Sequence, residues 1–365
     1  MTFYFFRTSS VKPRDKAMNP LPSRRPFFIE LGLSCNNGSS KKVLAKSIQR
    51  RSGFAVTVVG SNSHSHDSLV GWKLVHDGSI IHCQGNAPYC SIFELVSPIL
   101  KGEDGLLAIS KILHALRNST AAKVSLNNND VSLFHVHVSV KGISLESLKK
   151  VCQNFIKYED AMDAFFPACR RTGSEESNLY FRSCKEAILN PDGTRAITNG
   201  QRHQAIEACT SIYDLVVLMN PAGRCYKLNL RNLVTRRQPT LEFRQHHGTT
   251  NADKVQAWVR FCVHFVHNSS GSPDPIKPLK NLRTPRDQFI LLFFQVLPGD
   301  PVLQAYFEGR MDLFARLTGL RHVSSLRISN DDGRHGHDLP HNYTTVTDSL
   351  SAAAAIQQRE SYCPG

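Results

Sequence analysis

The stretch TLEFRQHH, at residues 240–247, constrains the fold most, because it alternates like a β-strand yet is polar at every second position. Successive side chains of a strand point to opposite faces, so Glu242 and Arg244 share one face while Leu241 and Phe243 share the other. A half-exposed strand normally turns its polar face to water. A carboxylate beside a guanidinium, in place of the usual Thr, Ser, Lys or Gln, indicates a face that binds a charged ligand.

The same alternation recurs in four more segments, FFIELGL, IFELVSP, LFHVHVSV and CYKLNLRNL. Each segment alone fits an antiparallel strand with one side in water. Together, however, their polar positions hold acids, imidazoles and amides, which suits one concave face that binds cations and anions side by side. The polar side chains on these predicted faces are Glu30, Glu94, His135, His137, Lys227 and Asn229.

Helical periods separate these strands without regular strand–helix–strand spacing. Helices are predicted over about residues 103–116, 144–166, 251–267, 286–296 and 301–317. The segment WKLVHDGSII is typical of a hairpin, and its Asp-Gly turn contains Asp77. Such mixing favours an α+β fold, in which a mainly antiparallel sheet is covered by helices on one side.

Composition limits the classes of partner. With 365 residues and 41% hydrophobic content, the chain can bury a sizeable core. No apolar run approaches the ~20 residues of a membrane-spanning helix, so we expect no membrane partner. Ten cysteines without a CxxC pair are typical of reduced thiols in a cytoplasmic protein. The net charge of +14 fits a solvated basic surface or phosphate-bearing ligands. Because no segment interleaves basic and aromatic residues, we expect no nucleic-acid partner.

The predicted polar face suits metal-assisted phosphate chemistry. Carboxylates and imidazoles bind divalent metals, and Mg²⁺ prefers one or two carboxylates together with phosphate oxygens and water. Arginine offers a rigid fork to a phosphate. Several acids with histidines and an arginine are therefore suited to Mg-ATP and phosphoryl transfer. The chain has no GxxxxGK[ST] loop and no GxGxxG turn, so side chains and metal on the sheet would have to hold ATP.

The order of these segments resembles the amidoligase family, which belongs to the same superfamily as glutamate-cysteine ligase and glutamine synthetase. The resemblance rests on FFIELGL, WKLVHDGSI, ELVSPIL, FHVHVSV, YKLNL and TLEFRQHHGT, and covers roughly residues 26–267. It implies a glutamine-synthetase-like fold, with a curved, mainly antiparallel sheet, a concave ligand face and helices on the back. It also implies an ATP- and Mg²⁺-dependent ligase that joins a carboxylate, activated as an acyl phosphate, to an amine. The expected substrate is an amino acid or a small peptide.

The resemblance implies roles for the polar positions. Arg244 and His137 are the expected catalytic residues. The expected metal ligands are Glu30, Asp77, Glu94, His135 and Glu242. The expected cofactor contacts are Arg244, His135, Lys227 and Asn229. Asp77 is also explained as an ordinary turn residue of its Asp-Gly pair.

One position departs from the family pattern, and two alternative functions stay open. Gly32 stands where the first strand of the family carries a second acid, which leaves the number of metal ions open. A metal-dependent hydrolase would use the His-x-His strand but would not explain the repeated acids. A catalytically degenerate member would bind its ligands without turnover.

Four segments are expected along the chain. Residues 26–270 form the catalytic domain, and residues 271–327 form a helical extension that packs on it. Residues 1–25 are expected to be a disordered basic leader, with a mitochondrial presequence as the alternative. Residues 328–365 are polar without a sustained period, and we expect them to be disordered.

Overall fold

The structure is a computed structural model that describes most of the chain. The described ranges are 18–22, 25–36, 40–60, 70–75, 91–119, 123–125, 134–174, 180–189, 197–235, 239–271 and 284–317. Asp77, most of the predicted leader and all of the predicted tail lie outside these ranges.

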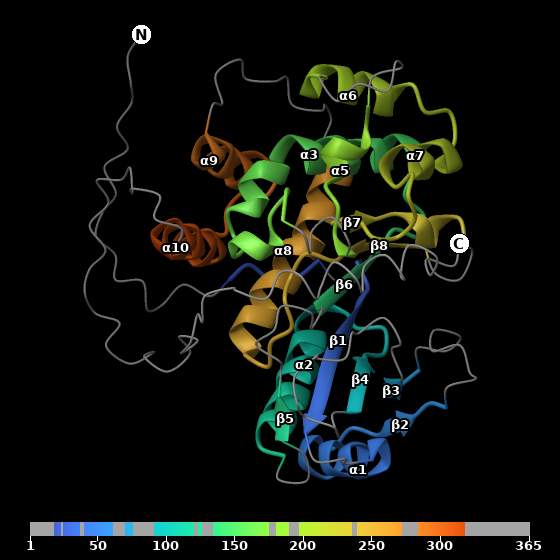
Figure 1. Cartoon of the computed structure of the whole chain (residues 1–365), viewed down its shortest axis with the longest axis vertical. Coiled ribbons are helices and arrows are strands. Elements are labelled where there is room, and N and C mark those ends of the chain that lie inside the picture. The colour runs from blue at the N-terminus through green and yellow to red at the C-terminus, as the bar shows by residue number, and fades with distance from the viewer. Residues whose placement is uncertain are drawn as a thin grey trace, which may run out of the picture.

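An eight-stranded sheet forms the centre of the described part (Figure 1). Seven strands lie in the order β2-β3-β4-β1-β6-β8-β7, and β5 pairs with the last residues of β1. Neighbours run antiparallel except for β2 and β3, and β2 and β7 end the sheet without closing it into a barrel. The strands are β1 (Phe27–Asn36), β2 (Val56–Val58), β3 (Trp72–Val75), β4 (Ser91–Val96), β5 (Lys123–Ser125), β6 (Phe134–Ser139), β7 (Leu228–Asn229) and β8 (Thr240–Phe243). The predicted mixture of helices with a mainly antiparallel sheet is confirmed.

Helices pack against the sheet. The α-helices are α1 (Lys41–Ser52), α2 (Gly102–Arg117), α3 (Leu145–Asp163), α5 (Cys184–Ala187), α6 (Asn199–Glu207), α7 (Ile212–Met219), α8 (Ala252–Gly271), α9 (Pro285–Gln295) and α10 (Pro301–Leu317). Among the described residues, the 3-10 turn η2 (Ala168–Arg170) lies between α3 and α5, and η3 (Arg231–Leu233) lies between β7 and β8. In Figure 1, α3, α5, α6 and α7 gather at one end of the sheet and α1 lies at the other. Helix α9 packs against α3, and α10 packs against α8.

The alternation of the sequence divides the sheet into two different faces. Leu31 and Phe243 point into the main hydrophobic core, which they share with α2, α3 and α8. The residues that alternate with these along each strand point to the opposite face of the sheet. There, Phe28, Val75 and Val96 form a separate small apolar cluster. The helices therefore cover one face, and the predicted polar side chains lie on the other.

Side-chain caps fix the two long helices of the core. The Ser144 hydroxyl accepts a hydrogen bond from the backbone N of Ser147 and begins α3. The Asn251 side chain accepts a hydrogen bond of 3.0 Å from the backbone N of Lys254 and begins α8. Both caps satisfy helix donors that have no partner within the helix. Among the described helices, none combines the length and the apolar character that a membrane span requires.

The segment CYKLNLRNL, predicted as one strand, is extended over only two residues. Buried Asn220 accounts for this difference. Its Nδ2 donates to the carbonyl of Leu228 at 3.0 Å, and its Oδ1 accepts from the backbone N of Leu230 at 2.6 Å. This one side chain supplies partners that a further strand would otherwise supply, so the chain turns into η3 directly after β7.

Candidate active site

The strand register brings the predicted polar positions together on the face opposite the helices. Glu30 of β1 pairs with His135 of β6, and His137 of β6 pairs with Glu242 of β8. Asn229 of β7 pairs with the same Glu242 from the other side. Side chains at paired positions of antiparallel strands lie close together. Four neighbouring strands therefore place acids, imidazoles and an amide in one row.

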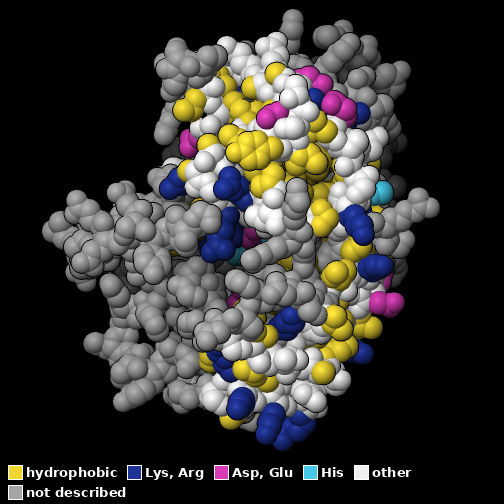
Figure 2. Space-filling view, turned by 90° about the vertical axis from the view of Figure 1, so that its right-hand side faces the viewer, with side chains coloured by type: hydrophobic (Ala, Val, Ile, Leu, Met, Phe, Trp, Pro, Cys, Tyr) yellow, Lys and Arg dark blue, Asp and Glu magenta, His cyan; other side chains and the backbone are white. Residues whose placement is uncertain are grey.

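Glu94 extends this row beyond β1. It belongs to β4 and pairs with Gly32, the position at which the family pattern has a second acid. Because Gly32 has no side chain, nothing projects from β1 beside Glu94 at this level of the sheet. Figure 2 shows acidic and histidine side chains inside a hollow on one face of the molecule, with basic side chains next to it.

Two histidines separate two buried carboxylates. His135 Nδ1 lies 3.2 Å from Glu30 Oε2 and 3.2 Å from Glu242 Oε1. His137 Nε2 lies 3.2 Å from Glu30 Oε2 and 3.8 Å from Glu242 Oε1. All four side chains are buried. Two acids that share the same partners repel each other, so a cation at this place would be stabilised by both.

Glu242 also contacts an amide and a guanidinium. Asn229 Nδ2 donates to Glu242 Oε2 at 2.5 Å, and Arg244 Nη1 donates to Glu242 Oε1. Arg244 is buried, and its Nε has no hydrogen-bond partner among the described residues. A guanidinium carries five donors in a fixed fork. Arg244 therefore has donors left for an anion beyond the one that Glu242 occupies.

Burial and charge act in opposite directions on the pKa values of these groups. Burial alone would raise the pKa of Glu242, but Arg244, followed by His137 and His135, lowers it to about 2. For His135, burial and then Arg244 lower the pKa, which favours a neutral imidazole. For His137, burial alone would lower the pKa, but Glu30 and Glu242 outweigh it and raise the pKa. The Glu242 carboxylate thus lies beside His135, whose neutral imidazole suits metal ligation.

Within the described part of the chain, two sets of side chains could each hold a metal ion. Glu30, His137 and Glu242 form one set, and Glu30, Glu94 and His135 form the other, with ligand atoms within 4.8 Å of one another in each. His135 Nε2 is buried without a hydrogen-bond partner among the described residues. A buried polar atom of this kind calls for an explanation, and a metal supplies one. Two carboxylates and one imidazole fit Mg²⁺ or Mn²⁺ in donor chemistry.

Three neighbours of His137 belong to the site but were not among the predicted site residues. The ring of Phe28 stacks on the imidazole, with centroids 4.0 Å apart. Thr240 Oγ1 lies 3.3 Å from His137 Nδ1, and Asn232 Nδ2 donates to the same hydroxyl at 3.3 Å. Thr240 lies two residues before Glu242, and Phe28 lies two residues before Glu30, so the strand alternation indicated that both side chains lie on the polar face. Asn232 lies in a 3-10 turn, and no sequence pattern indicated its place in the site.

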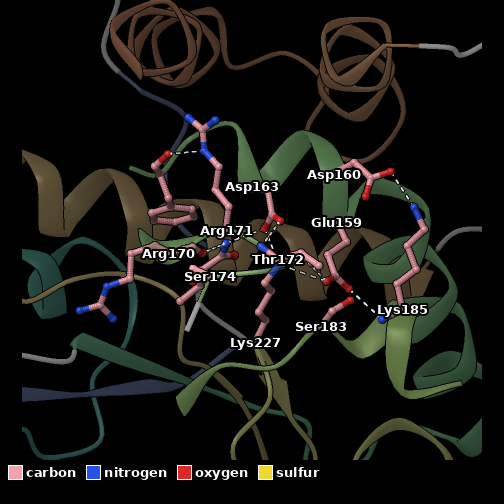
Figure 3. Close-up of polar contacts among 12 residues, drawn as sticks. Glu159, Asp160, Asp163, Arg170, Arg171, Thr172, Ser174, Ser183, Lys185 and Lys227 are labelled. Carbon is pink, nitrogen blue, oxygen red and sulfur yellow. Dashed lines mark hydrogen bonds and ion pairs between the residues drawn. The ribbon is translucent and has the colours of Figure 1, made fainter. Parts of the chain in front are cut away.

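Lys227 does not join this face, which corrects the prediction that its side chain points the same way as that of Asn229. Its side chain is 0% exposed, and its ammonium lies between Glu159 and Asp163 of α3, on the helix side of the sheet (Figure 3). The prediction assumed that Lys227 and Asn229 alternate within one strand. Since β7 begins only at Leu228, the alternation does not extend to Lys227.

A cavity of about 500 Å³ lies elsewhere, between α1, α2 and the start of α8, and contains none of the predicted site residues. The basic side chains of its lining include Arg51, His114 and Arg117. Arg51 lies in the last turn of α1, and His114 and Arg117 lie in the last turn of α2. Cations are favoured there because the C-terminal end of a helix carries partial negative charge. Helix ends therefore account for the basic lining, and we assign this cavity no chemistry.

Comparison with known families assigns the chain to one of them. The sequence model of a family described as "putative amidoligase enzyme" matches residues 24–266, more than half of the chain. The chain belongs to the amidoligase family. A comparison with curated proteins finds no match. The region matched to the amidoligase family contains every strand of the site and ends within α8. Its description assigns the chain to ligases as a general class.

Proposed function

We propose that this amidoligase-family chain is an ATP- and Mg²⁺-dependent ligase that joins a carboxylate to an amine, with an amino acid or a small peptide as substrate. The observation that carries the proposal is the convergence of Glu30, Glu242 and Arg244 on one face, with two histidines between them. Acids for a cation and a guanidinium for a phosphate are what phosphoryl transfer from ATP requires. The proposal includes a glutamine-synthetase-like curvature of the sheet.

The proposed reaction has two steps. A carboxylate oxygen of the first substrate attacks the γ-phosphorus of ATP, and the bond from that phosphorus to the β,γ-bridging oxygen breaks. The products of this step are an acyl phosphate and ADP. The amine nitrogen of the second substrate then attacks the acyl carbon, the bond from that carbon to the phosphate oxygen breaks, and the nitrogen loses a proton. The final products are an amide and inorganic phosphate.

In this proposal, the acids of the row bind the metal ion that neutralises charge on ATP. Glu30, Glu94 and Glu242, together with His135, would hold Mg²⁺. When bound, Mg²⁺ neutralises charge on the phosphates of ATP. Asp77 remains a further candidate ligand. The oxygen-rich donor set and the orphaned nitrogen of His135 support this part of the proposal.

The remaining side chains of the face orient the reactants. Arg244 donates hydrogen bonds to the γ-phosphoryl oxygens, where charge must be stabilised during transfer. His137 contacts the reacting substrate, held by the stacked ring of Phe28 and the hydroxyl of Thr240. Asn229 fixes the Glu242 carboxylate and offers a polar contact to substrate or phosphate.

Removing the arginine tests the proposal most directly. Arg244→Ala should lower ADP release from Mg-ATP by about 100-fold or more, because loss of one preorganised donor at developing charge has effects of that size. Arg244→Lys keeps the charge but loses the fork, so it should restore only part of the rate. ADP release is measured across a panel of amino acids and small peptides, with Mg²⁺ present.

The control is Arg117→Ala, which removes an exposed guanidinium in the last turn of α2 and should leave ADP release unchanged. Glu242→Gln should lose turnover as Arg244→Ala does, since it removes a carboxylate while keeping the size of the side chain. The proposal is wrong if wild-type protein neither releases ADP with any member of the panel nor binds nucleotide in calorimetry.

One observation also favours a second function, metal-dependent hydrolysis. Glu30, His137 and Glu242 form a set of three ligands, the number that catalytic zinc sites take from the protein. A hydrolase would contain stoichiometric zinc and would act without ATP. Hydrolysis would give the contact of Arg244 with Glu242 no role in the reaction. For that reason we place hydrolysis second.

A further inference from the structure

A buried polar cluster lies behind the sheet, on the side of α3 (Figure 3). At its centre is Lys227, whose Nζ lies 3.2 Å from Glu159 Oε1, 2.5 Å from Asp163 Oδ1 and 2.5 Å from Thr172 Oγ1. Burial alone would lower the pKa of Lys227, but Glu159 and then Asp163 outweigh it and raise the pKa. The ammonium therefore remains charged inside the protein.

Asp163 is the shared acceptor of this cluster. Its Oδ1 accepts from Lys227 and also from Gln245 Nε2, which lies 2.7 Å away. Gln245 Nε2 also donates to the carbonyl of Arg170 at 2.8 Å. The second oxygen, Oδ2, accepts from the backbone N of Thr172 at 2.8 Å. One carboxylate at the end of α3 thus ties together three separate segments of the chain.

Two of these segments flank the backbone of Arg244. Gln245 follows Arg244 in the sequence, and the backbone N of Arg244 donates to the carbonyl of Lys227 at 2.9 Å. Both neighbours are therefore anchored to Asp163 on the helix side, while the Arg244 guanidinium reaches Glu242 on the opposite side. Movement of Asp163 would shift the backbone from which Arg244 extends.

The placement of acids in α3 needs an explanation beyond helix stability. The last turn of α3 carries Asp160 and Asp163 and no basic residue, and Glu159 directly precedes it. Acids are disfavoured at this end of a helix, which carries partial negative charge. A buried ion pair is also often no more stable than apolar side chains of similar volume. Three acids at this helix end, two of them on a buried lysine, indicate a requirement for geometry.

We propose that Asp163, Lys227 and Gln245 are positioning residues for Arg244. From behind the sheet they hold the two segments beside its backbone, so that its guanidinium is aimed at the site before any ligand binds. This inference rests on the proposed function, because a fixed guanidinium matters where charge develops during phosphoryl transfer. The three side chains contact one another on the side of α3, behind the polar face.

The variant Gln245→Met tests this proposal with little risk to the fold, because it removes two hydrogen bonds without changing the charge. We expect kcat to fall by about 10- to 100-fold, since a misplaced catalytic group has effects of that size. The KM for ATP should stay near the wild-type value, because the lost interaction strengthens only during transfer. Asp163→Asn is the second variant and should show the same division between kcat and KM.

The matched control is Asp160→Asn. Asp160 lies in the same helix turn and pairs with Lys185 at 2.6 Å, but it has no contact with Lys227 or Gln245 among the interactions of the described residues. Its substitution should leave kcat unchanged. An equal loss of kcat in Asp160→Asn and Gln245→Met would mean general damage to this end of α3, and it would overturn the inference.

Hydrogen exchange at the amide of Arg244 gives a readout that does not need enzyme activity. Gln245→Met should speed exchange of this amide by about tenfold or more, while amides of β1 and β6 keep their wild-type rates. If the wild-type protein has no ligase activity, the proposed function is wrong. The hydrogen-exchange rate of the Arg244 amide would still decide whether Gln245 positions Arg244. Wild-type exchange and wild-type kcat in Gln245→Met would overturn the inference.

Discussion

His247, three residues beyond Arg244, is a histidine that folding keeps neutral. Burial, followed by the charges of Arg310 and Arg170, lowers its pKa to about 3. In the unfolded chain a histidine titrates near pH 6.5. Between these two values the unfolded state binds a proton that the folded state does not. The stability that neutral His247 contributes is therefore complete above about pH 6.5 and is lost as the pH falls toward about 3.

Because of His247, we expect the free energy of unfolding of the wild-type protein to fall by about 2 kcal/mol between pH 7 and pH 5. His247→Gln removes the titrating group and should make the pH dependence shallower by about that amount. Urea unfolding at the two pH values measures the difference. His114→Gln, at an exposed histidine, is the control and should match the wild type. The interpretation would be contradicted if the free energy of unfolding of His247→Gln changed with pH as much as that of the wild type.

The strand pattern predicted which residues share the polar face wherever regular strands carry them. Glu30, His135 and Glu242 lie in β1, β6 and β8, whose alternation is regular, and their ligand atoms come close together. Their roles in catalysis stay predictions. Lys227 could not be placed from the pattern, because its position depends on Glu159 and Asp163 of a helix far away in the sequence.

Elements with strong local signals were predicted more accurately than those set by distant partners. The helix predicted over residues 301–317 has the bounds of α10, and the helix predicted from residue 144 is α3, which Ser144 caps. The strand predicted in CYKLNLRNL is shorter because the side chain of Asn220 replaces a strand partner. Helices α1 and α7 were not predicted. α1 is polar over most of its surface, and α7 is short and mostly apolar, so neither shows a clear helical stripe.

Two helical glycines should respond in opposite ways to the same substitution. A Cβ at Gly105 in α2 would lie 2.9 Å from Leu100 Cβ and 3.1 Å from Phe27 Cζ. Gly309 in α10 would have no heavy atom of the described residues within 4 Å of a Cβ. Alanine favours a helix by about 1 kcal/mol over glycine, so Gly309→Ala should be stabilising by about that amount. Gly105→Ala should be destabilising, because overpacking costs about 1–3 kcal/mol.

Chemical unfolding of Gly105→Ala and Gly309→Ala measures both effects against the wild type. Stabilisation by Gly105→Ala would show that helix propensity, and not the close approach of α2 to Phe27 and Leu100, decides the outcome at Gly105.

On the scale of the whole molecule, the helices beyond the amidoligase-family match share the core of the matched region. Phe165, just after α3, lies 5.7 Å from Phe289 in α9 and 4.7 Å from Phe307 in α10, between ring centroids. All three side chains belong to the buried part of the molecule and form one hydrophobic cluster with α3 and α8. We therefore expect α9, α10 and the site-bearing sheet to unfold together.

Phe289→Ala should lower the free energy of unfolding by about 3–5 kcal/mol, because it leaves a cavity in this cluster. The control is Phe294→Ala in the same helix, whose side chain is 77% exposed and whose loss should have little effect. Thermal unfolding is followed by tryptophan fluorescence, since Trp258 lies in the cluster, and by circular dichroism. Two separate transitions in the wild type would contradict a single folding unit.

The central position of β1 has a consequence for how the protein is made. Its hydrogen-bond partners, β4, β5 and β6, all come much later in the chain. While the polypeptide leaves the ribosome, this apolar first strand has no edge to pair with, and long loops must close before any partner reaches it. An unpaired strand edge is also a template for association with other chains. The nascent chain, more than the finished molecule, is therefore the stage at which aggregation threatens this protein.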